Sequence, residues 1–167
     1  MAVIDIGAAA IGRAGTASGN VTWVGVENPA NDTGSITSIE VWFDALYGNA
    51  GSVEVATFDH EGSNALSTRD SEALGTVTAG SKQTFAGLAM DVATGDYLGL
   101  YFSGGALEFS YTGGSGAWDA SGDNIPCSST TFNLTAGRTI SLYGTGETAG
   151  VGIPLFMHHY KQMWGNN

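Results

Sequence analysis

The chain has 167 residues, with 26 glycines and 3 prolines; charged residues make up 13% of it and hydrophobic residues 43%. Five basic and 16 acidic residues give a formal net charge of −11. This charge argues against a nucleic-acid partner, because phosphate backbones are bound by clustered lysine and arginine. The apolar content argues against disorder, and the many glycines and few lysines argue against a helical bundle. The length fits one domain with a core of its own.

The first 20 residues are predicted to form an N-terminal arm or an edge strand. Residues 2–17 are mostly small and show no periodicity. The start of the chain lacks the basic and apolar regions of a secretory signal, so we expect synthesis in a cytoplasm. No stretch approaches the ~18 apolar residues of a membrane span, so we expect no membrane partner. Cys127 is the single cysteine, and a buried or half-buried thiol is expected there.

From residue 21 to 146 the hydrophobic pattern alternates as in β-strands. In residues 36–46, Ile39, Val41 and Phe43 share one face, and the other face carries Glu40, Trp42 and Asp44. Residues 59–71 and 112–130 are predicted to be polar loops. The predicted strands cover residues 21–26, 36–46, 53–58, 73–77, 82–88, 97–102, 106–111, 131–134 and 138–143.

This series predicts an all-β fold. Roughly eight to ten short strands separated by turns are typical of a sandwich or barrel. Because no helical pattern lies between them, a parallel sheet with crossover helices is excluded. We expect a two-sheet antiparallel sandwich of jelly-roll type over residues 21–146, with apolar terminal arms. The expected core residues are Phe43, Phe58, Phe102, Phe109 and Ile140.

Residues 147–167 are predicted to be a hinge followed by an aromatic C-terminal tail. Residues 153–164 are apolar, aromatic and nearly uncharged. Such a segment is expected either to pack back on its own sandwich or to dock on a partner, and both alternatives stay open. The candidate anchoring residues are Leu155, Phe156, His158, His159, Tyr160, Met163 and Trp164.

Aromatic and polar residues near residue 118 could bind sugar. An exposed aromatic ring offers a flat apolar face, and neighbouring polar side chains can bond to hydroxyl groups. Trp118 and Tyr111 are the candidate stacking rings, and Asp119 and Asn124 are their candidate polar neighbours. The competing interpretation places these aromatic side chains in the core.

Calcium is the one cofactor for which candidate ligands can be named. Calcium takes hard oxygen ligands from loops, and four aspartates lie in predicted turns: Asp91, Asp96, Asp119 and Asp123. Their spacing is not that of an EF-hand, and aspartate is also a common turn former. We therefore expect no metal or other cofactor, with calcium as the alternative.

No catalytic constellation can be assigned from the sequence. His60 lies between Asp59 and Glu61 in a predicted polar loop, where neighbouring side chains point apart. The glycine-rich residues 113–116 include Ser115 but precede no predicted helix, unlike a nucleophile elbow. We expect a protein without enzymatic activity.

Six short motifs occur in an order that resembles a recurrent all-β domain of tailed-phage, prophage and metagenomic surface proteins. They are residues 28–31 (NPAN), 39–42 (IEVW), 80–85 (GSKQTF), 95–99 (GDYLG), 121–123 (SGD) and 141–146 (SLYGTG). The resemblance implies a virion-type structural or adhesive module and carries no known activity.

The expected function is that of a structural protein on the virion surface. It would be a capsid decoration or fibre-type subunit, made in the host cytoplasm and anchored through its terminal segments. Expected partners are other virion proteins such as a major capsid protein, further copies of the chain, and a host glycan. The alternative function is a carbohydrate-binding module or adhesin domain.

Overall fold

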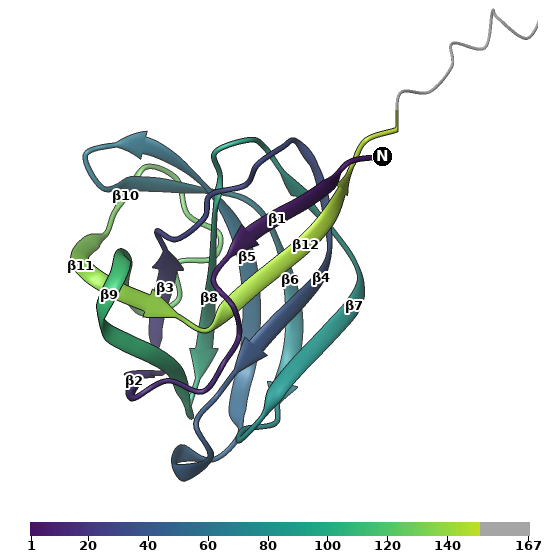
Figure 1. The fold of residues 1–167 in the computed structure, drawn as a ribbon. Coiled ribbons are helices and arrows are strands. Elements are labelled where there is room, and N and C mark those ends of the chain that lie inside the picture. Colours follow the sequence, from purple (N-terminus) through teal and green to yellow (C-terminus); the bar gives the residue numbers. More distant parts are fainter. Residues whose placement is uncertain (151–167) are drawn as a thin grey trace, which may run out of the picture.

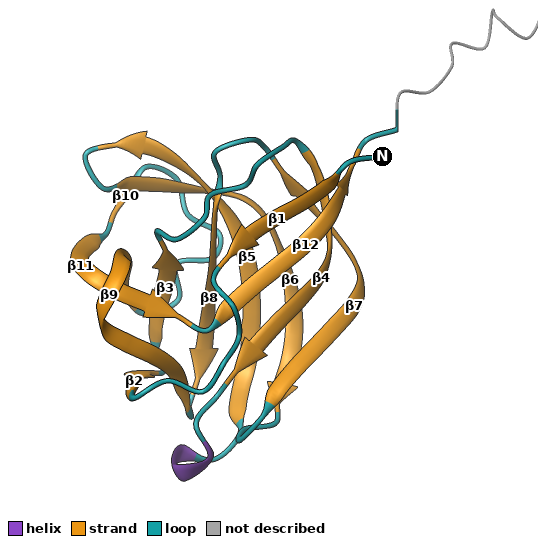
Figure 2. Ribbon diagram, viewed as in Figure 1, coloured by secondary structure: helices purple, strands orange, loops and turns teal. Residues whose placement is uncertain are grey.

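A computed structural model describes residues 1–150, which form a sandwich of two antiparallel β-sheets, as the sequence predicts (Figures 1 and 2). The anchoring residues predicted between 155 and 164 lie outside the described residues. The strands are β1 (Val3–Gly7), β2 (Gly15–Ser18), β3 (Val21–Gly25), β4 (Gly34–Trp42), β5 (Ala50–Gly62), β6 (Ala65–Val77), β7 (Lys82–Val92), β8 (Tyr97–Ser103), β9 (Ala106–Ser121), β10 (Thr130–Thr131), β11 (Asn133–Ile140) and β12 (Leu142–Thr148); a 3₁₀ turn, η1 (Ala45–Tyr47), follows β4.

The two sheets differ in size and shape. The smaller has the order β1-β12-β4-β7, and the larger has the order β10-β6-β5-β8-β3-β9-β11, with β2 paired to part of β9. Figure 1 shows β9 and β11 curling away from the body of the larger sheet. Register shifts in the β9–β11 pair accompany this curl.

The main core lies between the sheets, and the sequence predicts it well. Phe43 and Phe102 are fully buried there, and Phe109 and Ile140 are almost so; Phe58 is fully buried in the second core described next. Strand β4 turns Ile36, Ile39 and Val41 inward, with a register shift after Ile36 that restores the alternation. The five expected core residues are therefore confirmed as buried.

A second, smaller core lies on the outer face of the larger sheet. It contains Val24, Ala56, Phe58, Leu66, Trp118, Ile125 and Phe132. Residues 122–132, here called the strap, cross this face from β3 to β6. Thr22 Oγ1 donates to Gly122 O over 2.9 Å at one side, and Thr68 N donates to Cys127 O over 2.9 Å at the other. The larger sheet is thus buried on both faces, which explains why β8 is apolar on both sides.

Two segments predicted to be loops are strands. Residues 59–71 continue the β5–β6 hairpin, which turns only at residues 63–64. Residues 112–121 continue β9 and pair with β11. Both predictions are wrong because the apolar alternation disappears in these parts of the strands: most side chains of β6 are exposed or half-buried, and residues 112–116 of β9 are rich in glycine.

The borders of the smaller sheet are capped by side chains. Asn31 Oδ1 accepts from Asp5 N over 2.9 Å at the β1 border. At the β7 border, Asp70 Oδ2 accepts from Asp91 N over 2.8 Å and Glu72 Oε1 accepts from Ala89 N over 2.7 Å. These contacts occupy backbone donors that would otherwise be free to pair with another strand.

Candidate functional site

The two ends of the described chain meet at one corner of the sandwich, here called the terminal corner. Strands β1 and β12 pair from Val3 opposite Glu147 to Gly7 opposite Tyr143. Beyond the last pair, Ala2 N donates to Thr148 Oγ1 over 3.0 Å and Thr148 N donates to Ala2 O over 3.1 Å. Chain that enters before residue 2 or leaves after residue 148 therefore does so at the same place (Figure 1).

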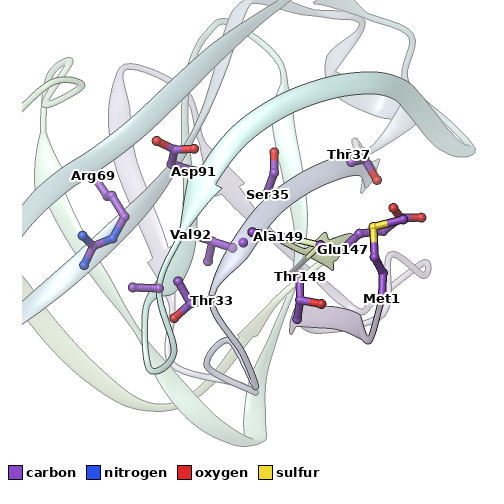
Figure 3. A pocket seen from close by; sticks show the side chains of 13 residues that line it. Met1, Thr33, Ser35, Thr37, Arg69, Asp91, Val92, Glu147, Thr148 and Ala149 are labelled. Atoms are coloured by element: carbon purple, nitrogen blue, oxygen red, sulfur yellow. The ribbon is translucent and has the colours of Figure 1, made fainter. Parts of the chain in front are cut away.

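A pocket of about 620 Å³ opens beside the terminal corner. Figure 3 shows Met1 and Glu147 at one side of this pocket and Arg69 at the other, with Val92 and Ala149 between them. The strand ends of β4, β7 and β12 supply most of its wall, and Ala149 and Gly150 lie on its rim. The sequence did not single out this pocket, because its walls come from five separate segments of the chain.

An ion pair closes the pocket at the Arg69 side. The Asp96 carboxylate is 2% exposed and accepts from Arg69 Nε, from Arg69 Nη2 over 3.0 Å and from Ala93 N over 2.8 Å. The hydrogen bond to Asp96 is the main cause that raises the pKa of Arg69. Arg69 Nη2 also lies 3.9 Å from the exposed Asp59 carboxylate. The bidentate geometry fixes the β7–β8 turn against β6.

The predicted stacking ring of Trp118 is buried. Its indole is 3% exposed and its Nε1 donates to Asn64 Oδ1 over 3.0 Å. Tyr97 packs edge-on against it at 4.9 Å between ring centroids, and His60 covers it at 5.2 Å. Of the two interpretations, the core position of Trp118 is therefore confirmed and the exposed stacking ring is wrong, because strand β9 places the indole in the outer core rather than in a loop.

The other three sugar-site candidates are not gathered around Trp118. Tyr111 is 60% exposed and packs edge-on against Phe109 at 4.6 Å between centroids. Asp119 faces Arg138, whose Nη1 lies 4.0 Å from Asp119 Oδ1, and as the neighbour of Trp118 in a strand it points to the opposite face. Asn124 belongs to the strap, where its Nδ2 donates to Ser121 O over 3.1 Å.

The four calcium candidates are not brought together. The Asp96 carboxylate accepts hydrogen bonds from Arg69, and the Asp119 carboxylate faces Arg138. Asp123 Oδ1 accepts from Ile125 N over 3.0 Å, as a turn-forming aspartate does. Across residues 1–150, no three His, Cys, Asp or Glu side chains are close enough to hold one metal ion.

Glu61 next to His60 is bonded to the strap rather than to the histidine. Its carboxylate accepts from the hydroxyls of Ser129 and Ser67, which lower the pKa of Glu61. His60 is exposed and lies against the rings of Trp118 and Tyr97. The three residues 59–61 thus make three different contacts.

Cys127 is half-buried, as predicted.

A buried polar cluster, missed by the sequence analysis, ties the N-terminal segment to the sandwich. Arg13 Nε donates to Ser141 Oγ over 2.8 Å, and Arg13 N donates to Glu108 Oε2 over 2.7 Å. Burial lowers the pKa of Arg13, although Glu27 and Glu108 act in the opposite direction. Glu108 and Ser141 are both buried. Glu108 alternates with the apolar residues Leu107 and Phe109, so no pattern in the sequence indicated its burial.

Comparisons with protein-family models, with curated proteins and with solved structures found no match. Within the described part of the chain, no helix is long and apolar enough to cross a membrane.

Proposed function

We propose that this chain is a non-enzymatic structural subunit of a virion surface, a capsid decoration or fibre-type protein, attached through the terminal corner. The observation that carries the proposal is the pairing of Ala2 with Thr148, which places both ends of the sandwich at one point. An attachment unit needs one place from which its linking segments leave, and this pairing supplies it. The virion setting comes from the sequence resemblance in residues 28–143.

The composition of the following segment supports attachment at this corner. Residues 151–167 begin directly after the pocket rim and include Leu155, Phe156, Tyr160, Met163 and Trp164. Aromatic residues and methionine are enriched in the centres of protein interfaces. His158 and His159 are the further anchoring candidates. A major capsid protein is the partner class that the resemblance implies.

The strand order supports the jelly-roll part of the prediction. β1, β4, β7 and β12 form the smaller sheet, and β3, β8, β5 and β6 lie side by side in the larger one. These are eight strands in two sets of four, the strand count of a jelly roll. The remaining strands extend the larger sheet beyond β3 and beyond β6.

Immunogold labelling of particles from the source culture tests the proposal. Antibodies raised against the whole chain are expected to label the outer surface of intact particles. If they bind only free protein, the virion assignment is wrong.

A truncation that ends the chain after Gly150 tests the attachment route. It keeps every strand of the sandwich, since β12 ends at Thr148. We expect it to unfold at the same urea concentration as the whole chain but to be missing from particles. A matched control replaces the tail with an uncharged Gly/Ser segment of equal length. Particle binding by the truncated chain would contradict attachment through residues 151–167.

A further inference from the structure

The end of the sandwich opposite the terminal corner is nearly free of charge, and we infer that it is a surface through which two copies of this chain associate. This end, here called the neutral end, is formed by η1 and by the turns that connect β2 to β3, β6 to β7 and β8 to β9. The inference stands independently of the proposed function, because it uses neither the terminal corner nor the tail.

Backbone pairing places these four turns together. Gly51 lies opposite Ser103, Ala50 lies opposite Val77, and Val21 lies opposite Phe102. Phe43, which leads into η1, forms a bridge with Leu107. Figure 1 shows this end at the bottom of the molecule, away from the N-terminus.

The turns that form the neutral end contain no charged residue. They are residues 18–21, 45–49, 78–81 and 103–106. The turns at the other end carry Glu27 and Asp32, Asp59 and Glu61, and Asp91 and Asp96. Asp44 and Asp123 lie at the margin of the neutral end, and each carboxylate accepts a backbone N–H, from Leu46 and from Ile125. Lys82 directly follows the β6–β7 turn, and its Nζ donates to Glu40 Oε1 over 3.1 Å, so these two charges are paired with each other.

Two large apolar side chains project from this end. Leu46 is 89% exposed and Tyr47 is 59% exposed. The turn that carries them is held firmly: Asp44 Oδ1 accepts from Leu46 N over 2.7 Å, and Asp44 N donates to Ala106 O over 2.8 Å. A turn fixed in this way displays its apolar side chains in one orientation, which lowers the entropic cost of a contact.

Charge identifies a second copy as the occupant. At a net charge of −11, two copies repel each other across most of their surfaces. Contact through the neutral ends keeps the acidic turns of both copies far apart. A basic partner would instead find its most favourable electrostatic interactions at the acidic turns of the other end, and it would form no ion pair with the turns of the neutral end. The expected contact is isologous, with Leu46 and Tyr47 of one copy against the same surface of the other.

Sedimentation equilibrium of the whole chain, from micromolar to near-millimolar concentration, tests this inference. The wild type is expected to show a monomer–dimer equilibrium. Leu46→Asp and Tyr47→Asp are each expected to weaken the dimer by about tenfold or more, because each change would bury an unpaired carboxylate in the contact between the two copies. A wild type that stays monomeric throughout this range would overturn the inference.

Leu134→Asp and Tyr111→Asp are the matched controls. Leu134 on β11 is 46% exposed and Tyr111 on β9 is 60% exposed, and both lie on the curled part of the larger sheet. They are expected to leave the dimer constant unchanged within about twofold. Equal weakening by the two pairs of variants would overturn the assignment to the neutral end. Circular dichroism of all four variants confirms that the comparison concerns folded chains.

The salt dependence gives a readout that is independent of mutation. A contact without ion pairs, between two acidic chains, is expected to hold or strengthen as sodium chloride is added, because salt screens the remaining repulsion. A dimer that dissociates with added salt would be held by ion pairs, and the inference would be wrong.

Discussion

Removal of the Asp96 carboxylate, which holds Arg69 beside the pocket, is expected to destabilise the sandwich. Asp96 is 2% exposed and accepts two hydrogen bonds from the Arg69 guanidinium and one from Ala93 N. In Asp96→Ala the Ala93 amide loses its partner, at about 1–2 kcal/mol. The Arg69 side chain is 35% exposed, so water replaces part of its lost bonds, and we assign it about 1–2 kcal/mol.

The expected loss is therefore about 2–4 kcal/mol in the free energy of unfolding. For a chain of this length that is a fall in Tm of about 6–12 °C. Urea unfolding followed by tryptophan fluorescence measures the loss. Asp59→Ala is the control, since its exposed carboxylate lies 3.9 Å from Arg69 Nη2 and is expected to contribute under about 0.5 kcal/mol. Equal losses in the two variants would refute the assigned role of Asp96.

The same pair of variants separates a structural role from a calcium-binding role. If the Asp96 carboxylate binds only Arg69 and Ala93, added calcium is expected to leave the urea-unfolding midpoint of the wild type unchanged. A midpoint that rises with calcium in the wild type and in Asp59→Ala, but not in Asp96→Ala, would show that Asp96 is a metal ligand. That result would restore the calcium alternative.

Three further changes probe the outer core, the strap and the smaller sheet. Asn64→Ala leaves the Trp118 indole N–H without its partner and is expected to lower the free energy of unfolding, measured in urea, by about 1–3 kcal/mol. Asn133→Ala, at an exposed site, is the control and is expected to lower it by under about 0.5 kcal/mol. The Ser129 amide resonance is expected to titrate at a pH below the ordinary pKa range of glutamate, because the pKa of Glu61 is lowered in the folded chain. The contact between Glu61 and the strap is fully present above the unfolded-state pKa and is lost as the pH falls through the folded-state pKa. Glu61→Gln is expected to abolish this titration. Gly146→Ala would bring a Cβ within 2.0 Å of Ser35 O and is expected to cost about 2–4 kcal/mol, whereas Gly12→Ala meets only ordinary contacts and stays within about 0.5. A Gly146→Ala protein as stable as the wild type would contradict the close approach of β12 to β4.

The alternating pattern was sufficient to predict the parts of the fold that have one buried face. Ile39, Val41 and Phe43 alternate with Glu40 and Trp42 along the chain, and the structure buries Ile39, Val41 and Phe43 completely. Such alternation indicates a strand without reference to its neighbours. The same information predicted Phe43, Phe102 and Phe109, which are buried between the sheets, whereas Phe58 is buried on the outer face of the larger sheet.

The curl of β9 could not be predicted, because its glycines are typical of a loop. Gly113 and Gly116 have φ values of 88° and 132°, a region that favours glycine. They let the strand change direction while Gly114 stays paired with Gly137 of β11. A glycine-rich stretch predicts a turn from local propensity, and here the pairing with β11, whose residues lie 14 to 31 positions after their partners in β9, decides otherwise.

The error over Trp118 has a related physical cause. Whether a ring at that position is free depends on what covers the outer face of the larger sheet. The strap does so through Ile125 and Phe132, which bury the neighbouring apolar side chains. Those two residues are separated in the sequence by polar ones and show no period. Only the fold reveals that this sheet has apolar contacts on both faces.

The separation of the two proposed surfaces makes them independent in experiment. Strand β4 starts at the pocket wall with Gly34 and ends at Trp42, shortly before η1, so it spans roughly 30 Å between them. Changes at sites farther apart than about 10 Å usually add in free energy. A chain that combines Leu46→Asp with truncation after Gly150 is therefore expected to show the dimer constant of the first change and the particle binding of the second. A dimer constant altered by the truncation alone would mean that the tail contributes to the association, and the two surfaces could no longer be treated separately.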